Sequence, residues 1–171
     1  LTDHGNCNGL AYQVLHAKKM KEEGKDFKPI FGVEAYFHPS IKDWKAQYDE
    51  ARENKKAAKK AGASGTVVED ENRADKNVLN QRSHLILLAQ NQTGLNNIFE
   101  LVSKSFQGDH FYRFPRVDYE ALKEHSEGVI AASACLGGVY AGDMWRNRDD
   151  GDEAVLEAMR ETTRQMLDVF G

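Results

Sequence analysis

The sequence opens with Leu1-Thr2-Asp3-His4-Gly5-Asn6, in which a carboxylate and an imidazole stand side by side ahead of a glycine turn. A histidine at the point where a strand ends and a loop begins is a common way for α/β enzymes to build an open metal site. The chain has no initial Met and no strand ahead of this motif. We therefore expect a fragment of a larger protein whose first residues lie inside a β-strand.

The composition predicts a single folded domain. The chain has 171 residues, 40% of them hydrophobic and 29% charged, which is enough for one domain with a sizeable core. The formal net charge of -4 argues against a general polyanion binder, so any contact with nucleic acid must come from a local patch or from other parts of a larger protein.

Cys7 and Cys135 are far apart and do not have the spacing of a disulfide framework, which indicates reduced thiols in an intracellular protein. No signal-like segment opens the chain, and no apolar run approaches the length of a membrane span. We therefore expect a cytoplasmic protein that does not associate with a membrane.

Apolar runs alternate with segments of helical spacing along the chain. Such alternation predicts a parallel α/β sheet or barrel. Asn91 or Thr93, and later Asp118, are suitable caps for two of the helices. The expected strands are residues 29–37, 84–89 and 129–135, and the expected helices lie at about 8–23, 95–106, 118–127, 139–146 and 152–169.

The segment from about 40 to 82 has a different character, because charged residues crowd together in it. Trp44, Tyr48 and Ala51 give only a weak helical stripe, with little to bury. We expect an excursion from the domain that is partly helical and disordered around its Gly/Ser middle at 62–65. The lysines at 55–60 fit a solvated face better than a contact with phosphates.

Four side chains that can bind metals stand at or beside the ends of expected strands, and each has a simpler interpretation. His4 and His84 can be hydrogen-bonded core residues, and Cys135 can be a small buried hydrophobe. Glu34 is different, because a carboxylate inside an apolar strand is costly unless it meets a cation or several donors. We interpret Glu34 as a metal ligand or as half of an ion pair.

Taken together, these residues favour a metal site. The C-terminal ends of parallel strands meet at one rim, where His4, Glu34 and Cys135 would bring N, O and S ligands together. This donor set suits zinc, or manganese if the carboxylate and imidazole dominate. His84 precedes its apolar run, so it reaches the rim only if its strand is antiparallel or short.

Four motifs, in this order, resemble the polymerase-and-histidinol-phosphatase (PHP) domain at the N-terminus of the bacterial replicative DNA polymerase III alpha subunit. They are Thr2-Asp3-His4-Gly5-Asn6, Lys28-Pro29-Ile30-Phe31-Gly32-Val33-Glu34, His84-Leu85-Ile86-Leu87-Leu88-Ala89 and Ser133-Ala134-Cys135-Leu136-Gly137-Gly138. The resemblance covers nearly the whole chain apart from the charged segment. It implies that residues 1–171 form a partial PHP domain: an incomplete distorted (β/α) barrel with a charged insertion at about 40–82. The first strand of the barrel and its C-terminal part are then missing from the sequence.

The resemblance also implies a cluster of divalent metals, zinc or manganese, with His4, Glu34, His84 and Cys135 at four of its ligand positions. Asp3 then matches a neighbouring carboxylate that orients the site. Arg113 and Arg116 lie on a loop where they can hold a substrate phosphate, with an ion pair to acidic neighbours as the equal alternative. The family's opening His-x-His, the Asp that soon follows it and its late Asp-x-His are absent, so the fragment alone is expected to bind metal weakly and to be inactive.

The function implied is that of a part of a replicative DNA polymerase, a nucleotidyltransferase, in which this piece contributes to a 3′–5′ proofreading exonuclease or phosphoesterase site. Its expected partners are primer-template DNA, bound by the full-length protein, and replicase subunits such as a proofreading exonuclease and a sliding clamp. One alternative is an inert PHP scaffold that docks a separate exonuclease. The other is a stand-alone phosphatase such as histidinol phosphatase, against which the motif at 133–138 argues.

Overall fold

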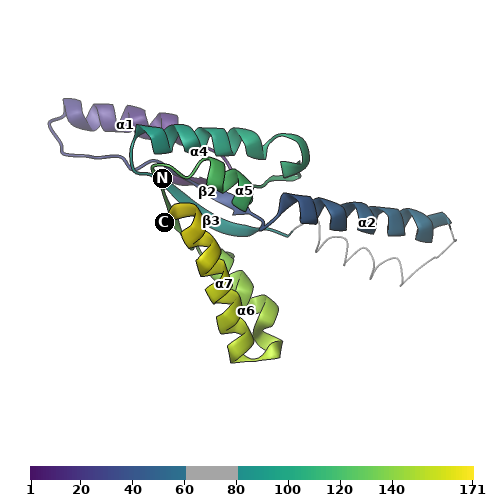
Figure 1. The fold of residues 1–171 in the computed structure, drawn as a ribbon. Helices are drawn as coiled ribbons and strands as arrows, with labels where there is room; N and C mark the ends of the chain where they lie inside the picture. Colours follow the sequence, from purple (N-terminus) through teal and green to yellow (C-terminus); the bar gives the residue numbers. More distant parts are fainter. Residues whose placement is uncertain (61–80) are drawn as a thin grey trace.

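The computed structural model describes residues 1–60 and 81–171, which form a mixed α/β fold (Figure 1). The strands are β1 (Thr2–His4), β2 (Gly32–Phe37), β3 (Ser83–Ala89), β4 (Phe111–Tyr112), β5 (Phe114–Pro115) and β6 (Val129–Ala132). The α-helices are α1 (Leu10–Glu22), α2 (Ile41–Lys60), α4 (Gln92–Ser105), α5 (Tyr119–Glu124), α6 (Val139–Asn147) and α7 (Asp152–Phe170). Short 3₁₀ turns lie at η1 (Gly108–His110) and η2 (Arg148–Asp150). The Gly/Ser stretch at 62–65 lies outside the described residues.

The main sheet has the strand order β1-β2-β3-β6, and its directions are mixed. β1 and β2 are parallel, whereas β3 is antiparallel to both β2 and β6. The expectation of an all-parallel sheet is therefore wrong at β3. The reason is visible in Figure 1, where α2 extends away from the sheet instead of crossing back over it. The chain returns at the end where β2 stopped, with Phe37 opposite Ser83, and β3 must run the opposite way.

The strands have one buried face and one partly open face. Along β2, the buried residues Val33, Ala35 and Phe37 alternate with Glu34 and Tyr36, as the period of two in a strand requires. The buried face packs with Leu85 and Leu87 of β3 and with Ile98 and Leu101 of α4, in one hydrophobic core. The charged and polar members of these strands therefore share the other face.

Two helices begin at the same buried carboxylate, Asp118. Its Oδ1 accepts a hydrogen bond from the Ala121 backbone N–H at 3.0 Å, which caps α5 as predicted. Its Oδ2 accepts one from the Ile41 N–H at 3.1 Å, at the start of α2. Asn91 confirms the other expected cap, because its Oδ1 accepts from Gly94 N–H at the start of α4. Asp118 thus joins segments that are 77 residues apart.

The first turns of α2 pack tightly on the domain, so the expectation that the charged segment buries little is wrong here. Trp44 is 1% exposed and Ile41 is 5% exposed. The Trp44 indole stacks on Tyr48, with 5.6 Å between ring centroids, and the Arg116 guanidinium lies 4.4 Å from the Trp44 ring centroid. Beyond these turns most side chains of α2 are exposed, and the helix extends into solvent (Figure 1).

The four-stranded sheet agrees with the predicted α/β class, whereas the barrel and the bounds of the insertion stay predictions. Across residues 1–60 and 81–171, no helix has the combined length and apolar character that a membrane crossing requires.

We predict that Trp44→Ala lowers the free energy of unfolding by about 3–5 kcal/mol, because it empties a buried aromatic site. Trp145→Ala is the matched control: Trp145 is 54% exposed, and its loss should cost less than about 1 kcal/mol. Urea unfolding followed by circular dichroism measures both. Equal small losses would show that α2 is not an integral part of the domain.

Candidate metal centre

Strand register brings three predicted ligands onto one face of the sheet. His4 pairs with Glu34 in the parallel β1–β2 ladder, and His84 pairs with Tyr36 in the antiparallel β2–β3 ladder. Glu34 and Tyr36 are two residues apart, so their side chains point to the same side. His84 stands at the start of β3, and because β3 is antiparallel this start lies beside the end of β2. The sequence predicted that His84 reaches the site only if its strand is antiparallel or short, and β3 is antiparallel.

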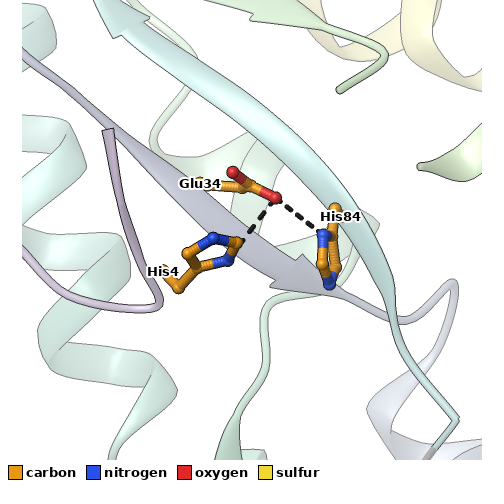
Figure 2. A group of neighbouring side chains, drawn as sticks. All are labelled: His4, Glu34 and His84. Carbon is orange, nitrogen blue, oxygen red and sulfur yellow. Dashed lines mark ion pairs between the residues drawn. The ribbon is translucent and has the colours of Figure 1, made fainter. Parts of the chain in front are cut away.

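Glu34 lies between the two imidazoles, as Figure 2 shows. Its Oε1 is 2.6 Å from His84 Nδ1 and 3.5 Å from His4 Nδ1. One ligand atom from each of the three residues falls within 4.8 Å of the others. The Glu34 side chain is 13% exposed and His84 22%, whereas His4 is 60% exposed. The cluster is therefore enclosed on the β3 side and open on the β1 side.

The turn after β1 fixes the position of His4. Gly5 has a φ of +67°, in the left-handed region that favours glycine, and its N–H donates to the Glu34 backbone carbonyl at 2.8 Å. A Cβ at Gly5 would lie 3.0 Å from both Pro115 Cγ and Tyr36 Cε2. Glycine is required here by conformation and by space, and the turn it makes holds His4 beside Glu34.

Cys135 lies next to the cluster, on a turn beyond the end of β6. Its Sγ is 3.4 Å from His84 Nδ1 and accepts the Gly137 N–H at 3.3 Å. The Gly137 carbonyl accepts the His84 backbone N–H at 2.8 Å, which fastens this turn to β3. β6 ends at Ala132, three residues before Cys135, so the expected strand 129–135 is shorter than predicted. The thiol nevertheless reaches His84.

Asp3 faces away from the cluster. As the neighbour of His4 on β1 it points to the opposite side of the sheet, and its Oδ2 accepts the Gly9 N–H at 2.5 Å. The carboxylate thus holds the loop between β1 and α1. Any influence of Asp3 on the site passes through the backbone around His4 rather than through contact with a metal ligand.

Arg113 and Arg116, the two predicted phosphate-binding residues, have different surroundings. Arg113 is exposed, in the turn between β4 and β5, with its guanidinium 5.6 Å from the Tyr112 ring centroid. Arg116 has 0% exposure, and its Nε and Nη1 donate to the backbone carbonyls of Gln81, Tyr112 and Phe114. Burial lowers its pKa to about 10. This placement favours a structural role for Arg116, and phosphate binding by Arg113 or Arg116 stays a prediction.

Sequence reasoning missed Tyr36 and Arg82, which border the cluster. The Tyr36 ring centroid lies 5.4 Å from that of His84 and 6.4 Å from that of His4. The Arg82 guanidinium carbon lies 5.0 Å from the Tyr36 centroid. The available signal was strand alternation: Tyr36 follows Glu34 by two residues, and Arg82 precedes His84 by two.

The donor set fits a divalent metal. Two imidazoles and a carboxylate are the ligand types of catalytic zinc sites, and they also suit manganese. The approach of both imidazoles to one poorly exposed carboxylate oxygen is the arrangement expected of side chains that share an ion. His4, Glu34 and His84 therefore form a candidate metal site.

The candidate metal centre lies in a domain whose family is known. The model of the PHP domain family matches residues 1–171, the whole chain. The chain belongs to the PHP domain family. In the part of the chain that the structure describes, this PHP domain has a four-stranded α/β sheet and a possible His/Glu/His metal site.

Curated relatives of this PHP domain include polymerase subunits. It is 37% identical over 138 residues to the DNA polymerase III subunit alpha of Helicobacter pylori strain 26695, which covers 81% of the chain and 8% of the relative. The same subunit of Helicobacter pylori strain J99 is 36% identical over 94% of the chain and 10% of its own length. That of Thermus aquaticus is 35% identical over 100% of the chain and 11% of its own length. The chain thus spans about a tenth of the length of these relatives.

The two cysteines of this PHP domain provide an internal test of the candidate site. Cys135 is exposed, whereas burial and then Asp3 raise the pKa of the half-buried Cys7 thiol to about 11. A raised thiol pKa favours the neutral form, so at about pH 8 only about one Cys7 in a thousand is the reactive thiolate. We predict that iodoacetamide modifies Cys135 well before Cys7, and that zinc slows the modification of Cys135 alone.

Mass spectrometry of tryptic peptides gives both rates. Since Cys7 reports any general effect of zinc on the protein, a drop confined to Cys135 isolates the site. An unchanged Cys135 rate at saturating zinc would count against a contact between Sγ and the ion.

Proposed function

We propose that this PHP domain is the N-terminal part of a replicative DNA polymerase alpha subunit and that it hydrolyses phosphodiester bonds at DNA 3′ ends with bound zinc or manganese. The observation that carries the proposal is the pairing of Glu34 with His4 and His84, in a chain that matches the PHP family throughout. The three relatives named above are each a DNA polymerase III subunit alpha, which supports a polynucleotide as substrate.

In this proposal His4, Glu34 and His84 hold the metal, and Cys135 supplies a fourth donor. A bound divalent ion polarises a phosphodiester and lowers the pKa of water toward neutrality. Glu34 brings negative charge to a poorly exposed position, and its location between the imidazoles keeps the donors together. The thiol of Cys135 would favour zinc over manganese, because sulfur ligands suit zinc.

The shape of the cluster supports access for a substrate. His4 is 60% exposed, whereas His84 and Glu34 are shielded beneath Tyr36 and the turn that carries Cys135. A strand end can approach from the β1 side, where His4 is exposed. Other metal ligands and the polymerase centre would lie in the full-length protein, so the proposed partners are primer-template DNA and other replicase subunits. Such a role places the protein in the cytoplasm.

A second candidate function is an inert scaffold that docks a separate exonuclease. The exposed apolar side chains of α1 favour it, with Tyr12 77% and Leu15 62% exposed, one helical turn apart. The two candidates differ in whether the site holds metal and cleaves DNA.

We predict that Glu34→Gln lowers the zinc and manganese content of the full-length protein at least about tenfold, since it removes the anionic ligand of the cluster. Arg113→Ala, a substitution at an exposed position on a neighbouring loop, should leave the metal content unchanged. Inductively coupled plasma mass spectrometry measures both. Equal metal content in the two variants would remove Glu34 from the ligand set.

We further predict that the full-length protein removes nucleotides from a primer 3′ end in zinc or manganese and that His84→Ala abolishes this activity, because His84 is the better shielded of the two imidazoles. Electrophoresis of a 5′-labelled primer follows the digestion, and primer extension serves as the control for folding. A protein without metal that extends primers but leaves 3′ ends intact would favour the scaffold.

A further inference from the structure

A second concave site lies beside the cluster, where β2 ends and β3 begins. It is a cavity of about 400 Å³, bordered by the polar side chains of His38, Gln81, Arg82, Ser83 and Arg146 together with two apolar residues. Pockets that accept small ligands measure about 300–1,000 Å³. Two of the described residues that line the cavity carry guanidinium groups and none carries a carboxylate. The cavity therefore has the volume and the charge for an anionic group.

The Arg82 guanidinium packs against two aromatic rings at the border between this cavity and the candidate metal centre. Its guanidinium carbon lies 3.8 Å from the Phe114 ring centroid and 5.0 Å from that of Tyr36. Two aromatic faces fix the plane of the guanidinium, as arginine favours and lysine does not. The same Tyr36 ring packs against His84. A ligand of Arg82 is thus one aromatic ring away from the cluster.

Arg146 reaches the cavity from α6. A Cβ placed on Gly142 would lie 3.0 Å from Arg146 Nη1 and 3.2 Å from Ser83 Oγ, so the guanidinium occupies space beside β3 that a side chain at 142 would fill. Its Nη2 donates to Asp143 Oδ1 at 2.7 Å. Asp143 is 6% exposed, and its Oδ2 accepts a hydrogen bond from the Thr162 hydroxyl at 2.7 Å. A buried carboxylate thus holds the Arg146 guanidinium.

The His38 imidazole completes the polar wall of the cavity. Its Nε2 lies 3.4 Å from Gln81 Oε1 and its Nδ1 lies 2.8 Å from the Ser40 carbonyl oxygen. Burial, together with the charges of Arg116 and Arg146, lowers its pKa, which favours the neutral imidazole at neutral pH. The positive charge at the cavity therefore comes from the two arginines.

We propose that this cavity binds a phosphate of a DNA strand whose adjacent 3′-terminal phosphodiester is held at His4, Glu34 and His84. Guanidinium groups bind phosphate oxygens through paired N–H donors. Arg82 precedes His84 by two residues, about 6.7 Å along an extended strand, which is comparable to the spacing of consecutive phosphates in a polynucleotide. This inference rests on the proposed function and deepens it, because a second phosphate site selects polynucleotides over phosphate monoesters.

The first test uses the full-length protein with manganese, a single-stranded oligothymidylate and the small diester bis(p-nitrophenyl) phosphate. Arg146→Gln should raise KM for the oligonucleotide about tenfold more than KM for the small diester, since it removes one charged hydrogen-bond partner of a second phosphate. Arg148→Gln is the matched control, because Arg148 lies outside the cavity and contacts Asp149 and Trp145. A purely structural role for Arg146 would impair both substrates alike.

The second test does not depend on catalysis. With metals removed by EDTA, an oligonucleotide that carries 5-iodouracil near its 3′ end is photo-crosslinked, and the modified peptides are mapped by mass spectrometry. We expect crosslinks at Tyr36 or Phe114, weaker with Arg146→Gln and unaffected by Arg148→Gln. Arg82→Lys should also weaken them, since lysine keeps the charge and loses the stacked plane.

The outcomes separate this inference from the proposed function. Crosslinks at Tyr36 or Phe114 without cleavage by the wild-type protein would support the phosphate site and contradict the exonuclease role. Cleavage that His84→Ala abolishes, with oligonucleotide KM unaltered by Arg146→Gln and no crosslink at Tyr36 or Phe114, would overturn the phosphate site and leave the exonuclease role standing.

Discussion

The register between β2 and β3 is the constraint on which the candidate site depends. It places His84 opposite Tyr36, and therefore on the face that carries Glu34. A slip of one residue would turn His84 into the core and bring Leu85 to the metal site. Such a slip is opposed by the burial of Leu85 and Leu87, which are at most 1% exposed against α4. Hydrophobic packing on one face of the sheet thus sets the geometry of the polar cluster on the other.

Buried polar groups outside the sheet fix the position of the segment that leads into β3. Desolvation of Arg116 lowers its pKa to about 10, and the cost of burying this cation is offset by backbone carbonyls and by the face of Trp44. One of those carbonyls belongs to Gln81, three residues before His84. Asp118, on the same loop, anchors the start of α2. Arg116 therefore contributes to the candidate site by fixing the backbone from which His84 projects.

The sequence was sufficient to predict the order of helices and strands and the caps at Asn91 and Asp118. It was also sufficient to interpret Glu34 as a metal ligand or as half of an ion pair. It could not supply the direction of β3, because alternation of helices and strands does not say whether α2 crosses the sheet or leaves it. The burial of Arg116 was also beyond it, since an arginine in a polar loop is usually exposed. The burial of Trp44 was not predicted, because charged residues surround it in the sequence. One buried turn is nevertheless enough to dock a helix on the domain. In each case the missing information was a tertiary contact.

The surroundings of the cluster suggest how a strand would be recognised in the proposed reaction. Tyr36 and Phe114 already contact Arg82, and Tyr36 also contacts the imidazoles of His4 and His84. A base that lies against either ring meets a π-face that accepts every base, so this contact carries little sequence preference. Recognition would then depend on phosphates, which carry no sequence information. A site that removes any terminal nucleotide must not discriminate between the four bases. Recognition through phosphates meets this requirement.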